Sequence, residues 1–205
     1  MKAIILAAGM GKRLYPFTKD VPKGLIKVNN TTIIENLMNS LLPFQKEISE
    51  IIMVVGYKQE KLIDAVGYEY EGLKIKYVEN ELYDKTNNIY SLALASEYIN
   101  DDVLLFESDV YFEHKIIKDL MRVIKKGDNI AVVDRYKQWM DGSVVTLHDG
   151  YIGELVNSKL KKWEGVYKTV NIYYFNREFF TKVFIPMLKV YMQTHSDNHY
   201  YEIVL

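Results

Sequence analysis

A loop that contains two glycines and several cations follows the first apolar run of the chain. Residues 6–13 read LAAGMGKR. Residues 1–27 carry six lysine and arginine side chains and a single acidic one, a local charge of +5 in a chain of 205 residues whose formal net charge is −1. Glycines let backbone N–H groups approach an anion closely, and basic side chains supply positive charge. The spacing therefore predicts a phosphate-binding loop whose cations are Lys12, Arg13 and Lys23.

Neither of the two familiar glycine-rich phosphate loops fits this stretch. The Rossmann fingerprint requires a third glycine three residues after Gly11, where this chain has Leu14. The Walker A pattern requires four residues between its glycines, whereas only Met10 separates Gly9 from Gly11. The simpler alternative is a surface turn whose charges face water, but such turns seldom combine this density of glycine, cation and proline directly after a buried strand.

Two acidic residues, Glu107 and Asp109, come at the end of another apolar run. The alternation of side chains along a strand places both on one side if the strand continues that far. A carboxylate at a strand end is well placed to hold Mg²⁺ against phosphate oxygens. The sequence therefore predicts Asp109 as a metal ligand, and a helix N-cap or a solvated turn fits Glu107 better.

The elements that must position these residues alternate between strands and helices, which is typical of a parallel sheet covered on both faces. The later part of the chain predicts an antiparallel extension of the same sheet, with no second domain. The chemistry is then expected beyond the carboxyl ends of the parallel strands. The predicted strands are residues 3–6, 51–55, 74–78, 103–106, 130–133, 144–147 and 169–175, and the predicted helices are residues 32–42, 58–66, 88–98 and 116–124.

Composition excludes several classes of protein. The chain has no cysteine, so disulfide scaffolds, thiolate zinc sites and cysteine nucleophiles are ruled out. The basic cluster is compact in a chain of net charge −1, which disfavours nucleic-acid binding. No apolar run approaches the roughly 20 residues that cross a bilayer, and the first residues lack a signal-peptide cleavage site. We expect a cytoplasmic enzyme.

The pattern GxGxRLxPxTxxxPK, which begins at Gly9 and ends at Lys23, resembles the signature loop of nucleotidyltransferases that activate sugar phosphates and related phosphorylated alcohols. Lys12 departs from it, because many members have Thr or Ser there. The resemblance implies a Rossmann-like α/β/α sandwich with a mixed, mainly parallel central sheet, and Asp109 as the strand-end metal ligand. It implies catalytic roles for Arg13, Lys23 and Asp109, with Lys23 bridging the reacting phosphates. The implied nucleotide-binding residues are Leu6, Ala7, Ala8, Gly9, Gly11, Lys12, Arg13, Asn87 and Asn88.

Three further stretches, residues 86–91, 139–142 and 168–173, resemble choline-phosphate and 2-aminoethylphosphonate cytidylyltransferases, some of which are fused to an aminotransferase. An ammonium headgroup favours an aromatic face and a carboxylate, and Trp139, Tyr173 and Asp141 are of the right types. The alternatives are ordinary core aromatics for the two rings, a turn for Asp141 and a helix cap for Asn87 or Asn88. The predicted acceptor-binding residues are Lys23, Trp139, Asp141, Asn171 and Tyr173.

The resemblance implies a Mg²⁺-dependent cytidylyltransferase. An oxygen of a phosphonate or phosphoalcohol acceptor, such as 2-aminoethylphosphonate or phosphocholine, attacks the α-phosphorus of CTP, and pyrophosphate leaves. One alternative is a sugar-1-phosphate nucleotidylyltransferase that uses UTP or dTTP. A second alternative is a catalytically inactive nucleotide-binding scaffold domain.

The end of the chain predicts a helix that is just beginning. Asp197 and Asn198 precede a short apolar run with no closing turn signal. Members of the resembling family continue into another strand and an acidic motif that supplies a second metal ligand. We therefore expect residues 1–205 to form a single domain truncated at its C-terminus, cut from a longer protein with a further domain fused downstream.

Overall fold

Four parallel strands form the centre of the sheet in the computed structural model, which describes residues 1–140, 142–156 and 165–205. They are β1 (Lys2–Leu6), β4 (Glu50–Val55), β6 (Leu73–Glu79) and β7 (Val103–Glu107), in the order β7-β1-β4-β6. Ile4 of β1 is in register with Ile52 of β4 and with Leu105 of β7. The apolar runs at these positions are buried on both faces, as expected for parallel strands that are covered by helices.

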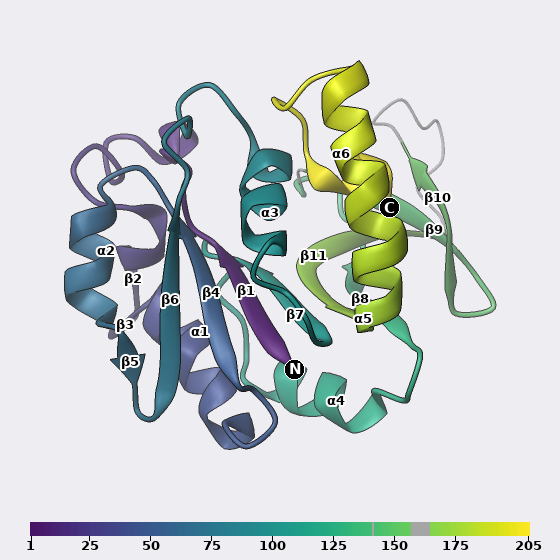
Figure 1. Ribbon diagram of the computed structural model, residues 1–205, viewed down its shortest axis with the longest axis horizontal. Helices are drawn as coiled ribbons and strands as arrows, with labels where there is room; N and C mark the ends of the chain where they lie inside the picture. Colours follow the sequence, from purple (N-terminus) through teal and green to yellow (C-terminus); the bar gives the residue numbers. More distant parts are fainter. Residues whose placement is uncertain (141, 157–164) are drawn as a thin grey trace.

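Helices cover both faces of this sheet (Figure 1). Residues of α1 (Ile33–Leu41), α2 (Gln59–Val66) and α4 (Lys115–Val123) pack into the core on one face. Residues of α3 (Asn88–Ser96) and α6 (Ile185–Thr194) pack into the core on the other. A capping box begins α1, where Glu35 N–H donates to Thr32 Oγ1 at 3.2 Å and Thr32 N–H donates to Glu35 Oε2 at 2.7 Å. The predicted α/β/α sandwich with a mixed, mainly parallel sheet is confirmed.

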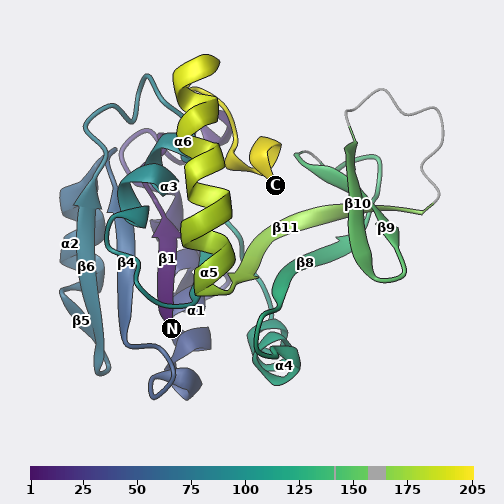
Figure 2. The same cartoon turned by 45° about the vertical axis from the view of Figure 1, so that its right-hand side comes forward.

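The second half of the chain adds antiparallel strands on the β7 side. The strand β11 (Val166–Phe175) pairs with β7 through its last residues and with β8 (Asn129–Arg135) at both of its ends. Its first residues also pair with β9 (Val144–His148). The strand β10 (Tyr151–Val156) pairs with β9. Figure 2 shows β8 and the outer part of β11 leaving the body of the molecule with β9 and β10 at their far end; we call these strands the antiparallel arm. Asn171 lies at a break in the β11–β8 register and has a left-handed φ of 57°.

The remaining elements are short or were not anticipated. The strands β2 (Lys27–Val28), β3 (Thr31–Thr32), β5 (Glu69–Tyr70) and β10 have no counterpart among the predicted strands. The same is true of α5 (Arg177–Phe179), the π-helical turn over Phe180–Phe184 and α6. At the end of the chain a 3₁₀ helix, Tyr201–Val204, replaces the expected α-helix, and its N-cap is Tyr200, without a side-chain cap.

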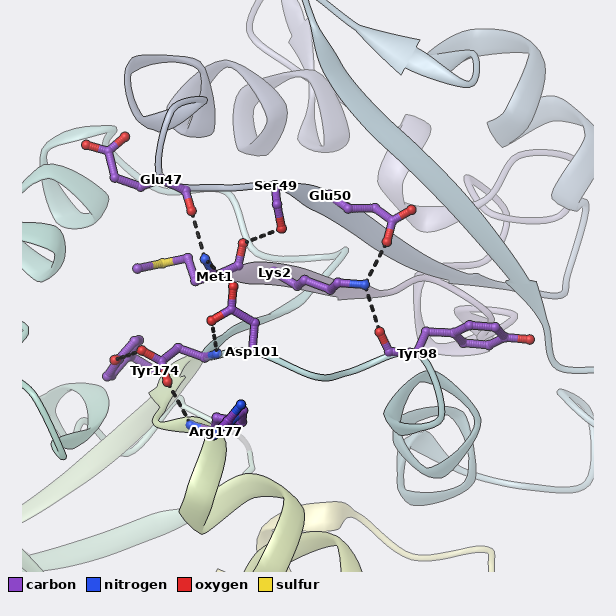
Figure 3. A network of polar contacts seen from close by, with 10 residues as sticks. Met1, Lys2, Glu47, Ser49, Glu50, Tyr98, Asp101, Tyr174 and Arg177 are labelled. Atoms are coloured by element: carbon purple, nitrogen blue, oxygen red, sulfur yellow. Dashed lines mark hydrogen bonds and ion pairs between the residues drawn. The ribbon is translucent and has the colours of Figure 1, made fainter.

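Polar contacts tie the strands together at the amino end of β1 (Figure 3). The amino group of Met1 pairs with Asp101 at 2.9 Å and donates to the carbonyl of Glu47 at 2.8 Å. Lys2 Nζ pairs with Glu50 at 2.9 Å and donates to the carbonyl of Tyr98. At the amino end of the sheet the charged groups are therefore paired with one another. The polar cavity described below lies at the carboxyl end. No helix in the described part of the chain is long and apolar enough to cross a membrane.

Candidate active site

A cavity of about 300 Å³ lies at the carboxyl ends of β1 and β7. It brings together most of the residues that the sequence predicted for nucleotide binding and catalysis, although they come from four different parts of the chain. The predicted residues that line the cavity are Leu6, Ala8, Gly9, Arg13, Lys23, Asn87, Asn88, Asp109 and Asn171. Ala7, Gly11, Lys12, Trp139 and Tyr173 are not among the lining residues, and Asp141 lies outside the described residues.

Gly11 does not line the cavity, but its backbone conformation determines the shape of the loop. Its φ of 63° is left-handed, and a Cβ at this position would overlap Lys23 Cγ and lie 2.8 Å from Lys23 Cδ. The fully buried Thr18 fixes the same turn, because its Oγ1 donates to the carbonyl of Gly11 at 2.7 Å. Only glycine combines this backbone conformation with so close an approach of another side chain. Gly11 thus lets Lys23 lie across the loop and reach the cavity.

The loop is anchored on both neighbouring strands. Ala7 N–H donates to the carbonyl of Val54 at 2.8 Å, and Ser108 N–H donates to the carbonyl of Leu6 at 3.0 Å. The first bond holds the loop to β4, and the second holds the turn after β7 to the end of β1. The phosphate-binding loop and the predicted metal ligand are therefore parts of one hydrogen-bonded unit.

Lys23 and Asp109 form an ion pair within the cavity. Lys23 comes from the 3₁₀ turn Lys23–Leu25, and Asp109 comes from the turn after β7, 86 residues later. Both side chains keep solvent access, with 22% and 29% of their surface exposed. Each charge is therefore available to an incoming phosphate or cation that displaces its partner.

Glu107, which lines the cavity with this ion pair, has a pKa far above its ordinary value. Asn88 Nδ2 donates to Glu107 Oε1 at 2.8 Å. Burial, followed by the nearby carboxylates of Asp109 and Glu202, raises the pKa of Glu107 to about 8. The sequence favours a turn or a helix cap for Glu107, whereas in the structure this residue lines the cavity together with Asp109.

The amino end of α3 forms another part of the cavity wall. Asn87 is the N-cap, and its side chain accepts from the N–H of Asn88 at 2.9 Å, so the capping alternative holds for Asn87. The buried Asn80 donates from Nδ2 to Thr86 Oγ1 and to Ser91 Oγ, each at 3.1 Å. Asn80, Thr86 and Ser91 all line the cavity, although they are not among the predicted binding residues.

The last residues of the chain also line the cavity. Asn87 N–H donates to the carbonyl of Asp197 at 3.0 Å, and Tyr201 N–H donates to Asn88 Oδ1 at 3.0 Å. These bonds hold the C-terminal segment against α3, so that Tyr200 and Glu202 line the cavity. Burial raises the pKa of Glu202, whose side chain is almost fully enclosed. No signal in the sequence pointed to these two residues, because the contact joins positions 113 residues apart.

Two residues that were predicted to bind the ammonium headgroup of the acceptor, Trp139 and Tyr173, do not line this cavity. Trp139 has 77% of its surface exposed and is not a lining residue, and Lys137 Nζ lies 5.9 Å from its ring centre. Tyr173 is buried in the core, with its ring 5.7 Å from that of Phe175 and 5.9 Å from that of Tyr201. It lines a second cavity, of about 620 Å³, that borders Glu202 from the arm side. This placement corresponds to the core-aromatic alternative for Tyr173.

The donor atoms at the end of β7 fit a hard divalent cation. Asp109 and Glu107 offer carboxylate oxygens, and Mg²⁺ is commonly held by one or two carboxylates together with substrate phosphates. In the parts of the chain that the structure describes, no group of three His, Cys, Asp or Glu side chains forms a complete protein site. Asp109 and Glu107 are therefore the residues at the end of β7 that could hold a divalent cation.

Comparisons with known proteins agree with this arrangement. The family model described as nucleotidyl transferase matches residues 2–198. The CMP-5'-(3-aminopropyl)phosphonate synthase of Streptomyces rubellomurinus is 30% identical over 98% of this chain, which spans only 32% of that protein's length. The choline-phosphate cytidylyltransferase of Streptococcus pneumoniae is 31% identical over 99% of this chain and 93% of its own length.

The solved structure of CTP:phosphocholine cytidylyltransferase from Streptococcus pneumoniae superposes with a TM-score of 0.76. The superposition covers 99% of this chain and 82% of that one, at 25% identity. The match therefore includes both the parallel core and the antiparallel arm. With the family model spanning nearly the whole sequence, the chain belongs to the nucleotidyl transferase family and is a nucleotidyltransferase.

Proposed function

We propose that this nucleotidyltransferase transfers the cytidylyl group of CTP to a small phosphonate or phosphoalcohol acceptor, such as 2-aminoethylphosphonate or phosphocholine, with release of pyrophosphate. The observation that carries this proposal is the convergence of Arg13, Lys23 and Asp109 on one cavity at the carboxyl ends of β1 and β7. The named activities of the two relatives described above support the choice of CTP and of such an acceptor.

The cavity divides into two sides that suit two substrates. The loop after β1 and the amino end of α3 supply Arg13, Lys23, Asn87 and Asn88 on one side, where we place the nucleotide. The antiparallel arm and the C-terminal segment line the other side, where we place the acceptor. The α-phosphorus would then lie between them, close to Lys23 and Asp109.

The reaction needs charge and orientation more than proton transfer. An oxygen of the acceptor, which is already anionic at neutral pH, bonds to the α-phosphorus, and the bond from that phosphorus to the pyrophosphate oxygen breaks with its electron pair. Lys23 and Arg13 offset the repulsion between the two anions and hold the phosphates in line. When Mg²⁺ is bound by Asp109, it supplies further positive charge at the phosphate oxygens. Binding of the nucleotide requires the Lys23–Asp109 ion pair to open, so that each charge meets its own ligand.

The direct test is pyrophosphate release with CTP, UTP, dTTP and ATP, each assayed against 2-aminoethylphosphonate, phosphocholine and hexose 1-phosphates in the presence of Mg²⁺. We expect turnover with CTP and one of the first two acceptors. Turnover only with UTP or dTTP and a hexose 1-phosphate would establish the sugar-phosphate alternative. Nucleotide binding without turnover in any combination would establish the scaffold alternative.

A further inference from the structure

Four buried side-chain oxygens have no hydrogen-bond partner among the described residues: the hydroxyls of Tyr173 and Tyr201, Glu202 Oε2 and Asn171 Oδ1. Only the last two belong to residues that line the cavity, and both can accept hydrogen bonds from a ligand. Glu202 has only 5% of its surface exposed, and both residues line the cavity that contains Lys23 and Asp109. Leaving a buried acceptor unpaired costs free energy, and the cost is higher for a charged group. A ligand that donates hydrogen bonds here would recover that cost.

The scaffold holds both acceptors in place. Asn171 lies in the register break of β11 with a φ of 57°. Glu202 follows Tyr201, which is fully buried and whose N–H is bonded to Asn88 Oδ1. Asn88 also bonds Glu107, so the position of Glu202 is coupled to the amino end of α3, where we place the nucleotide.

The surrounding charges favour a cation at this position. Glu202 lines the same cavity as Glu107 and Asp109, so side chains of like charge gather there and repel one another. Lys168 is the cation that acts on Glu202, and its Nζ donates to the carbonyl of Thr169. A ligand cation between Glu202 and Asn171 would offset the repulsion and satisfy both acceptors.

We propose that Glu202 and Asn171 bind the primary ammonium group of the acceptor and select aminoalkyl phosphonates or phosphates over trimethylammonium analogues. The inference rests on the proposed function and narrows it to one headgroup class. A primary ammonium carries three N–H donors, whereas a trimethylammonium group carries none and leaves both oxygens unpaired. Asn171 is one of the predicted acceptor-binding residues, and Glu202 takes the place of Trp139 and Tyr173, which do not line the cavity.

The experiment compares three acceptors with the wild-type protein and its variants, with CTP saturating. The acceptors are 2-aminoethylphosphonate, its N,N,N-trimethyl analogue and ethylphosphonate, which has no amine. For the wild type we expect kcat/KM to be at least about 100-fold higher for the primary amine than for either analogue, since a site built around buried polar groups rejects ligands that leave them unpaired. Glu202→Gln should reduce that ratio at least about tenfold, because the charge is lost while the shape is kept.

Two further variants separate recognition from folding. Asn171→Gly removes the side-chain oxygen while glycine accepts the left-handed backbone conformation of this position. This variant should lower the kcat/KM ratio between the primary amine and its analogues, but by less than Glu202→Gln does. Glu178→Gln, on the exposed surface of α5, is the matched control and should leave the ratio within about twofold of the wild type. The KM for CTP should stay nearly constant in all three variants. As a readout independent of turnover, calorimetric titration of each acceptor into protein saturated with α,β-methylene CTP should give the same order of affinities.

The outcomes distinguish this inference from the function on which it rests. Efficient use of CTP with the trimethyl analogue, or an equal loss of all three acceptors in Glu202→Gln, would leave the cytidylyltransferase proposal standing and overturn the role of Glu202 and Asn171. Turnover of hexose 1-phosphates with no use of any of the three acceptors would overturn both.

Discussion

Lys23 and Asp109 are the two side chains whose charges the proposed reaction needs most. The two side chains form an ion pair in the structure, so both charged groups already lie in the cavity before substrates bind. Removing a preorganised charge that faces the transition state costs about 100-fold or more in turnover. This ion pair therefore gives the clearest test at the level of single side chains.

Lys23→Ala should lower kcat by more than about 100-fold, and Asp109→Ala should do the same, because each removes charge that acts on the phosphates. Steady-state assays with CTP measure kcat, and a urea unfolding curve shows whether each variant is folded. Lys115→Ala, which breaks the exposed Lys115–Asp119 pair on α4, serves as the control and should leave kcat unchanged. A near-normal kcat in a folded Lys23→Ala or Asp109→Ala protein would refute the role assigned to that residue.

Glu107 gives a pH-dependent test. Its pKa in the folded protein is about 8, above the ordinary value of 4.5, so the fold favours the protonated form. The contribution of this group to stability is fully present below its unfolded pKa and is lost as the pH rises through about 8. The free energy of unfolding of the metal-free protein should therefore fall between about pH 5 and 8, and the fall should be smaller in Glu107→Gln.

Urea unfolding at several pH values measures this difference. Glutamine keeps an oxygen that can accept the bond from Asn88, so the comparison isolates the ionisation. Glu202, whose pKa burial also raises, leaves a residual slope of the same sign in both proteins. Identical pH profiles for the wild type and Glu107→Gln would show that Glu107 titrates normally.

Side-chain types and spacing predicted the first loop and Asp109 because a phosphate site is built from a local pattern. Glu202 and Asn80 carried no such signal. Glu202 reaches the cavity through the bond between Tyr201 and Asn88, and neither residue is near the other in sequence. Trp139 illustrates the opposite case, since its type suits an ammonium group while its ring lies largely in solvent.

The loop from β1 to the Lys23 turn works as one element, with Gly11 at its centre. Gly11→Ala places a Cβ against the Lys23 side chain and forces a non-glycine residue into a left-handed conformation, which costs about 1–2 kcal/mol before any clash is counted. We expect a lower melting temperature and a raised KM for CTP. Thermal unfolding measures the first, and initial rates at varied CTP measure the second.

Gly9 provides the matched control for stability. A Cβ at Gly9 meets no other atom within 4 Å, and its φ is not left-handed. Gly9→Ala should therefore leave the melting temperature nearly unchanged. Equal melting temperatures for Gly11→Ala and the wild type would contradict the account of the loop.

Among the elements, those with strong periodicity or β-branched runs were predictable. The parallel strands and α1 to α4 match the patterns in the sequence within a few residues. The strand β10 and the helical stretch from α5 to α6 were not predicted. In α6 the exposed positions Met187 and Val190 are apolar, so its pattern does not alternate cleanly between a buried and an exposed face.

The molecule as a whole joins a parallel α/β body to an antiparallel arm, and the cavity lies where they meet. Figure 2 shows the C-terminus between α6 and the arm. In our account the body binds the nucleotide, and the arm and the C-terminal segment select the acceptor. The order of elements predicted the body and its carboxyl-end site, whereas the acceptor side depends on contacts between the last residues and α3 that local patterns do not encode.

The central claim is that this chain joins CMP to an aminoalkyl phosphonate or phosphoalcohol. The most direct measurement is ³¹P NMR of a reaction that contains the purified protein, Mg²⁺, CTP and 2-aminoethylphosphonate. The account predicts that the acceptor resonance is replaced by a pair of coupled signals from a new phosphonate–phosphate anhydride, together with pyrophosphate, and that UTP in place of CTP gives far less product. An unchanged acceptor resonance with CTP, while UTP or dTTP is consumed with a hexose 1-phosphate, would contradict it.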